Sequence, residues 1–201
     1  MKTIITLTAI FLFTFSMNGC GAIAALVVNK GNDKMLDYNI SKENQALLTS
    51  MAKDGYRVRF GEFIDASDSN ETIKCRLMTS VHPPKHETYV QYIQHAFEKE
   101  FKESGLYDEH ARTVITATIN EIEGSSVYGD AYWSFEVMLR SSNGEKYTVR
   151  SEYEYESSIT AAYACEEMHK TFPRALQKLI HDAIKDLKFK SLLDQNIKSH
   201  R

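Results

Sequence analysis

Residues 131–156, which read AYWSFEVMLRSSNGEKYTVRSEYEYE, give the clearest secondary-structure signal in the chain. Apolar and polar side chains alternate on both sides of a Ser-Ser-Asn-Gly turn, which is typical of two half-buried strands in a β-hairpin. A two-residue Asn143-Gly144 turn would put the two apolar sets on opposite faces of the sheet. We therefore predict a three-residue loop that ends with Gly144 in the left-handed region. This loop pairs Leu139 with Tyr147, Val137 with Val149, and Trp133 with Tyr153.

Shorter alternating stretches extend the sheet. They predict strands near 56–60, 73–77 and 115–119, whereas the glycines and polar residues of 123–130 indicate a loop. In the second of these strands the residues expected to face inward are Ile73, Cys75 and Leu77.

Helices are expected before, between and after these strands. Ser41 is an N-cap candidate for a short first helix. Thr88 and Gln91 have the spacing of a capping box, which opens a second helix. An apolar stripe that begins near Ala161 predicts the last helix, and Pro173 is expected to kink or restart it.

The element order and the polar outer face of the strands predict the fold class. The fold is expected to be α+β, a two-layer α/β sandwich with a mixed, mainly antiparallel sheet of four or five strands and helices on one face. The strands near 60 and 117, which a helix connects, should be parallel if they are neighbours.

The first twenty residues predict where the protein resides. Lys2 and the apolar residues 4–16 form a secretory signal that is too short to span a bilayer comfortably. The sequence MNGC at 17–20 is similar to the processing site of bacterial lipoproteins, so we expect Cys20 to carry the lipid. By analogy with the sorting rule of enteric bacteria, Gly21 favours the periplasmic face of the outer membrane.

Two alternatives remain open at this end of the chain. Ala22-Ile23-Ala24 could be an ordinary cleavage site that releases a soluble periplasmic protein, or residues 4–28 could remain as an uncleaved anchor. The expected organisation is a signal peptide at 1–19, a lipidated tether at 20–40, a single periplasmic α/β domain at 41–190 and a frayed tail at 191–201.

Two further cysteines, Cys75 and Cys165, form an even pair in a compartment that permits disulfides. Both belong to apolar faces that should point into the space between sheet and helices. A disulfide between them is therefore predicted, and the alternative is two buried free thiols.

The net charge and the histidine spacings argue against nucleic-acid binding, metal binding and catalysis. The net charge is −3, which argues against a nucleic-acid partner. His82 and His86 are separated by prolines that prevent a shared helix, and His169 lacks the second histidine of a zinc-protease motif. We therefore expect no catalytic residues, no metal site and no cofactor.

A further set of residues lies in the hairpin and the last helix, namely Trp133, the turn 141–144, Tyr153, Ala164-Cys165, Pro173 and Leu179-Ile180. In these residues the chain resembles a group of small, uncharacterised proteobacterial outer-membrane lipoproteins. The resemblance would cover roughly 56–189 and the MNGC stretch, and the order of elements is similar, at the level of fold only, to auxiliary lipoproteins of ABC-type envelope transport systems. It implies no functional residue.

Three functions are compatible with these features. The first is a membrane-anchored binding or accessory module of an envelope complex, with an envelope protein as partner and no catalysis of its own. The second is a carrier of a lipid or another apolar ligand, and the third is an envelope hydrolase. A carrier would line its ligand space with Trp133, Tyr153, Phe97 and Phe101.

Overall fold

The computed structural model describes residues 35–67, 73–77, 79–84 and 87–194. All of these belong to one compact unit. Cys20, the signal peptide and both alternative readings of the N-terminus lie outside the described residues.

The main sheet has four strands in the order β1-β4-β5-β6. They are β1 (Val58–Asp65), β4 (Thr113–Val127), β5 (Asp130–Ser141) and β6 (Lys146–Glu154). β1 runs parallel to β4, and the other neighbours are antiparallel. The predicted mixed sheet and the parallel pairing of its helix-connected strands are confirmed.

The β5–β6 hairpin has the predicted register: Leu139 is opposite Tyr147, Val137 is opposite Val149, and Trp133 is opposite Tyr153. The amide of Ser141 donates to the carbonyl of Glu145, and Gly144 between them has φ +102°. The three-residue loop is thus confirmed, and the buried face of the sheet set the register.

The predicted loop over 123–130 is wrong in its first half. β4 continues to Val127, and the turn is confined to the residues around Gly129. Gly124 lies opposite Trp133, and a Cβ at this position would come within 2.6 Å of Met168 Cε and 2.7 Å of Trp133 Cζ3. Gly124 therefore serves close packing inside a strand and does not mark a loop.

The predicted strand at 73–77 is only partly correct. β2 (Lys74–Cys75) pairs with β3 (Thr79–Ser80) in a separate two-stranded sheet, outside the main sheet. Cys75 is fully buried as predicted, whereas Leu77 is 89% exposed and has φ +59°. The left-handed backbone turns Leu77 away from the face on which the alternation had placed it.

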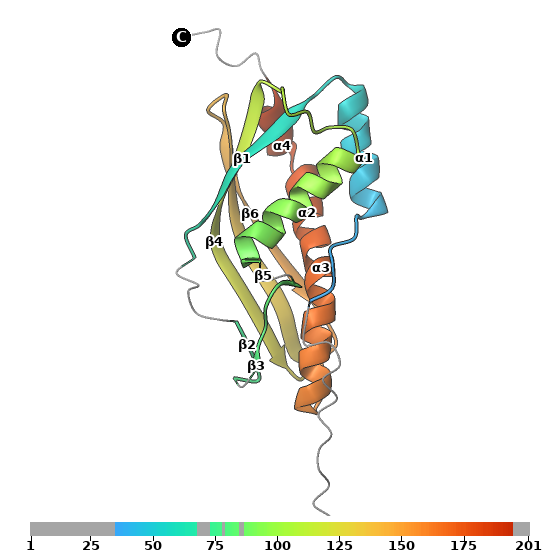
Figure 1. Ribbon diagram of the computed structural model, residues 1–201, viewed down its shortest axis with the longest axis vertical. Helices are drawn as coiled ribbons and strands as arrows, with labels where there is room; N and C mark the ends of the chain where they lie inside the picture. Colours follow the sequence, from blue (N-terminus) through green and yellow to red (C-terminus); the bar gives the residue numbers. More distant parts are fainter. Residues whose placement is uncertain (1–34, 68–72, 78, 85–86, 195–201) are drawn as a thin grey trace, which may run out of the picture. The chain divides into compact units, whose positions relative to one another are not determined.

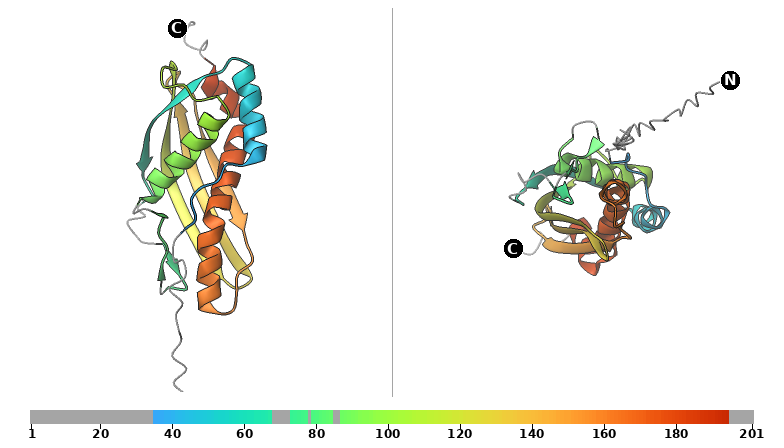
Figure 2. Two further views of the ribbon diagram at one scale, coloured as in Figure 1. Left: turned by 45° about the vertical axis from the view of Figure 1, so that its right-hand side comes forward. Right: turned by 90° about the horizontal axis from the view of Figure 1, so that it is seen from below.

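Helices cover one face of the sheet, as predicted (Figures 1 and 2). α2 (Tyr89–Glu103) contacts β1, and α3 (Ala161–Lys185) contacts β4, β5 and β6. α1 (Lys42–Lys53) packs on α2 and α3. Ser41 caps α1 by accepting from the amide of Asn44, and Thr88 and Gln91 form the predicted capping box of α2.

The last helix differs from its prediction. α3 continues through Pro173, and the chain restarts at Asp186, which caps α4 (Leu187–Leu193). Leu192 and Leu193 are 1% and 2% exposed, so the folded unit extends past the predicted boundary at 190.

The predicted tether at 20–40 is also too long. Met35 and Tyr38 are 2% and 6% exposed and belong to the core. Residues 35–40 are therefore part of the domain, which begins before the expected position 41.

Candidate functional site

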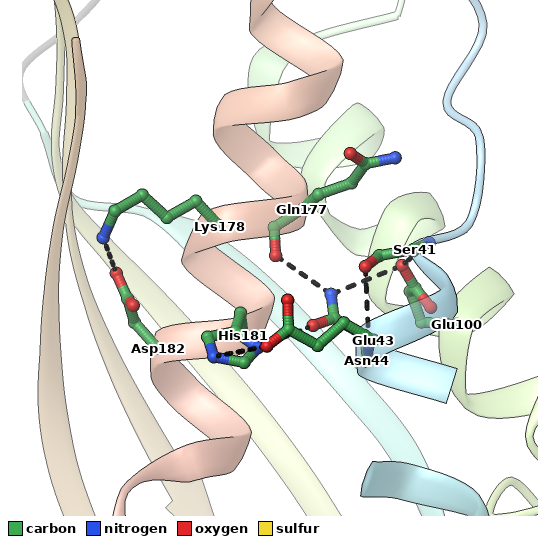
Figure 3. Close-up of polar contacts among 8 residues, drawn as sticks. All are labelled: Ser41, Glu43, Asn44, Glu100, Gln177, Lys178, His181 and Asp182. Atoms are coloured by element: carbon green, nitrogen blue, oxygen red, sulfur yellow. Dashed lines mark hydrogen bonds and ion pairs between the residues drawn. The ribbon is translucent and has the colours of Figure 1, made fainter. Parts of the chain in front are cut away.

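A buried polar cluster joins the segment before α1 to α2 and α3 (Figure 3). Glu100 lies at its centre and is fully buried. Its Oε1 accepts hydrogen bonds from the Tyr38 hydroxyl at 2.6 Å and from the Ser41 amide at 2.7 Å. Nδ2 of Asn44 lies 3.5 Å from the same oxygen and donates more closely, at 2.9 Å, to the carbonyl of Gln177. Glu100 on α2 is thus bonded to the segment before α1 and to Asn44 on α1, and Asn44 extends the connection to α3.

The electrostatics of Glu100 reflect its burial. Loss of water raises the pKa of this carboxyl above its ordinary value, although the hydrogen bonds from Tyr38, Ser41 and Asn44 act in the opposite direction. Oε2 has no hydrogen-bond partner among the described residues. Burial beside this carboxylate also raises the pKa of the Tyr38 phenol, which therefore remains a donor.

Side chains of α3 continue this cluster towards the surface. The ring of His181 lies 3.2 Å from Oδ1 of Asn44 and 3.6 Å from Oε1 of Glu43. One turn away, Lys178 donates to Asp182, and the hydroxyl of Ser151 on β6 bonds the same carboxylate oxygen. These contacts fix α1 and β6 on α3, so we interpret the cluster as structural rather than catalytic.

This cluster was not predicted from the sequence. Glu100 is spaced from Ile93, Ala96 and Phe97 as a residue on the same buried helix face, and all four are at most 1% exposed. A carboxylate at such a position is the signal that could have indicated a buried partner.

The predicted disulfide is present: Cys75 and Cys165 are joined, with an S–S distance of 2.02 Å and their Cα atoms 5.5 Å apart. It connects β2 to α3, so Cys75 reaches α3 from the small second sheet rather than from the main one. A disulfide of this kind is typical of proteins outside the cytoplasm.

Several distant segments meet around this bond. The Arg76 amide donates to the Ser126 hydroxyl, and the Ser157 hydroxyl donates to the Ser126 carbonyl. Nη2 of Arg76 donates to the carbonyl of Ser158. We call this region the disulfide end and define it as residues 73–77, 125–132 and 153–165. Figure 1 shows it at the end of the sheet that lies away from α4.

The turn that follows Cys75 has an unusual backbone. Arg76 and Leu77 have φ values of +49° and +59°, which residues other than glycine rarely adopt. Nε of Arg76 is buried and has no partner among the described residues. The disulfide and the bonds of Arg76 hold this turn so that the Leu77 side chain projects into solvent.

Exposed apolar side chains are concentrated at the disulfide end. Of the eight large hydrophobic residues that are exposed within the described part of the chain, five lie there. Such a concentration is typical of an interaction surface, whereas single exposed apolar residues are ordinary. The five are Leu77, Val127, Tyr128, Ile159 and Tyr163.

Two hollows lie at or next to the disulfide end, and their linings share Glu154, Tyr155 and Glu156. The first, of about 560 Å³, lies at the β4–β5 turn and includes Tyr128, Asp130 and Tyr132. The second, of about 580 Å³, lies between the end of β6 and α3 and includes Glu167 and Arg174. Acidic residues outnumber basic ones in the two linings by five to one, with Asp130, Glu152, Glu154, Glu156 and Glu167 against Arg174. Carboxylates beside tyrosine rings suit a cationic ligand group.

The residues proposed for a ligand-carrying space lie in the core. Trp133 and Phe97 are at most 1% exposed. The ring of Trp133 lies 4.7 Å from that of Phe172, and Phe97 and Phe101 contact each other. Tyr153 is only partly buried. Among the described residues, no group of three His, Cys, Asp or Glu side chains is placed to hold a metal ion.

No helix within the described residues is long and apolar enough to cross a membrane.

Comparisons with known proteins show a similarity at the level of structure. No family model matches the chain, and no curated protein matches it. Among solved structures, the chain is similar to protein XCC0632 from Xanthomonas campestris, of the family DUF330. The TM-score is 0.45 at 12% identity, over 62% of this chain and 79% of that one.

Proposed function

We propose that this protein is a membrane-anchored, non-catalytic binding module that serves as an accessory subunit of an envelope complex. Its lipid would be carried by Cys20 at the periplasmic face of the outer membrane. The partner would bind at the disulfide end. The observation that carries this proposal is the concentration of five exposed apolar side chains beside two acidic hollows at that end.

The proposal predicts the chemistry of the partner surface. Apolar side chains would cover Leu77, Tyr128 and Tyr163, and basic groups would meet Asp130 and Glu167 in the two hollows. The apolar contacts would contribute about 25 cal/mol per Å² of buried surface, and the charges would mainly set orientation and specificity.

Site-specific photo-crosslinking in the living cell tests the binding surface. A photoreactive phenylalanine derivative would replace Tyr128 or Tyr163 in one set of strains and Leu187 in another. Leu187 is a matched control, because it is an apolar residue that is 86% exposed but lies on α4, away from the disulfide end. We expect a discrete protein adduct from the first two positions and none from Leu187. Equal adducts at all three, or none at the first two, would contradict the proposal.

The anchor requires its own test, since Cys20 lies outside the described residues. Metabolic labelling with a palmitate analogue should mark the wild-type protein and not Cys20→Ala. Label on the variant would remove the anchor from the proposal, although the binding surface could still exist on a free protein.

A further inference from the structure

β6 is an edge strand with one free side. The ladder bonds of Ser141 with Glu145 and of Tyr155 with Ala131 show that the odd-numbered residues of this strand face β5 with their backbone groups. The even-numbered residues from Lys146 to Glu154 therefore direct their N–H and C=O groups away from β5. Among the described residues, no backbone group pairs with this side.

The charges along this free edge are divided by sign. Its exposed side chains are Lys146, Thr148 and Arg150 in the first half, and Glu152 and Glu154 in the second. Edge strands often carry charges that prevent pairing with another strand. Here the two halves carry opposite signs, so an antiparallel copy of the same strand would meet complementary charges.

Most of these charges have no ion-pair partner in the part of the chain that the structure describes. Arg150 contacts Glu136 at 2.7 Å, but Lys146, Glu152 and Glu154 form no ion pair with any described residue. Lys146 is moreover opposite Arg140 on β5, which is a pairing of like charges.

We propose that two copies of this protein form a homodimer in which the free edges of β6 pair antiparallel, about a two-fold axis at Ser151. This register places Arg150 of each copy opposite Glu152 of the other, and Thr148 opposite Glu154. Lys146 then comes opposite Glu156, just beyond the strand. Four opposed residue pairs would exchange about eight backbone hydrogen bonds.

The position of the second hollow agrees with this arrangement. It lies between the end of β6 and α3 and is lined by Tyr153, Glu154, Glu156 and Glu167. In the dimer, the half of β6 that carries Lys146 and Arg150 in the second copy would lie next to this hollow. The result is a continuous eight-stranded sheet with a self-complementary interface, as two-fold symmetry requires.

Charge reversal tests the dimer by native mass spectrometry of the full-length protein released from detergent. The wild type should be dimeric at micromolar concentration. Arg150→Glu and Glu152→Arg should each raise the dissociation constant about tenfold or more, because each creates like-charge pairs on both sides of the axis. Lys53→Glu, which reverses an exposed charge on α1, is the control and should leave the dimer unchanged.

Mixing the two variants gives the decisive result. A heterodimer of Arg150→Glu with Glu152→Arg has opposite charges at both sites, so dimers should return in the mixture and contain one copy of each. Thr148→Pro should also dissociate the dimer without a change of charge, because proline lacks the backbone N–H that Thr148 directs towards the second copy. Retention of the Cys75–Cys165 disulfide and of the circular dichroism spectrum would show that the variants are folded.

Three outcomes would overturn the proposal. They are a wild type that is monomeric at micromolar concentration, a dimer that survives Arg150→Glu and Thr148→Pro, and a mixture of the charge variants that remains monomeric. None of these outcomes depends on the partner proposed for the disulfide end, which Tyr128 and Tyr163 test separately.

Discussion

The hydroxyl of Tyr38 donates a 2.6 Å hydrogen bond to Oε1 of Glu100, and both side chains are buried. A residue ahead of the first helix is thereby bonded to the C-terminal part of α2. We expect Glu100→Ala to lower the free energy of unfolding by about 2–3 kcal/mol, because it leaves the buried Tyr38 hydroxyl and the Ser41 amide without their acceptor. Urea denaturation followed by circular dichroism measures this change, and a change below about 0.5 kcal/mol would show that the cluster is not structural.

The raised pKa of Glu100 predicts how the free energy of unfolding changes with pH. A carboxyl whose pKa is higher in the folded than in the unfolded state contributes stability that is complete below the unfolded pKa and is lost as the pH rises through the folded pKa. Glu100→Gln removes this titration. The stability of Glu100→Gln relative to wild type should therefore increase as the pH rises from about 4, the ordinary pKa of glutamate, to neutral pH. Unfolding free energies measured over this range provide the test, and a constant or falling difference would contradict it.

Removal of the disulfide should destabilise the domain. The bond joins cysteines 90 residues apart, and a loop of this length corresponds to about 4.6 kcal/mol in the chain-entropy model. We expect the double variant Cys75→Ala/Cys165→Ala to lower the urea midpoint by an amount consistent with this loss. Wild-type protein measured with and without reductant is the control. If reduction leaves its midpoint unchanged, the bond contributes nothing to stability.

A methyl group at position 124 should be poorly tolerated. The Cβ of Gly124→Ala would meet Trp133 and Met168 at less than 3 Å, and such overpacking costs about 1–3 kcal/mol. Gly129→Asn is the matched control, since it lies in the neighbouring turn at φ +79° with no atom within 4 Å of its Cβ, and asparagine accepts that backbone. Thermal unfolding should separate the two variants clearly. Similar melting temperatures would mean that Trp133 and Met168 move aside at little cost.

Asn143 should hold α4 against the β5–β6 loop. Its Nδ2 donates to the carbonyls of Ser191 and Asp194, each at 2.8 Å, and its Oδ1 accepts from the Glu145 amide. We expect Asn143→Ala to cost about 1–2 kcal/mol and to increase amide hydrogen exchange in α4. Asn120→Ala, which removes a single 3.2 Å contact with Glu136, should leave the exchange of α4 unchanged.

The sequence predicts those parts of the fold in which the spacing of apolar side chains repeats over many residues. The alternation in 131–156 determined both the hairpin and its register, because a shift of one residue would have exposed Trp133 and Val137. The apolar stripe after Ala161 predicted α3 and the burial of Cys165 on it. Cys75 was predicted to be buried from the alternation at 73–77, although its strand belongs to the small second sheet.

Features that depend on a few residues or on distant partners escaped the same reasoning. Met35 and Tyr38 are two apolar residues in a polar stretch, and the burial of Tyr38 depends on Glu100, which lies 62 residues away. The outward projection of Leu77 depends on a left-handed backbone that alternation does not encode. The exposed apolar side chains of the disulfide end were therefore not predicted, although its disulfide was.

The bonding of residues 36–41 to α2 also has a mechanical consequence. The carbonyl of Leu36 accepts from Tyr92, that of Tyr38 accepts from Lys99, and that of Asn39 accepts from Gln177 on α3. A force applied through the chain ahead of Met35 would be transmitted to these two helices before it reached α1. In a single-molecule experiment that pulls from the N-terminal side, the hydrogen bonds of residues 36–41 to α2 and α3 should therefore resist the force first. The first helix should unwind only after they break.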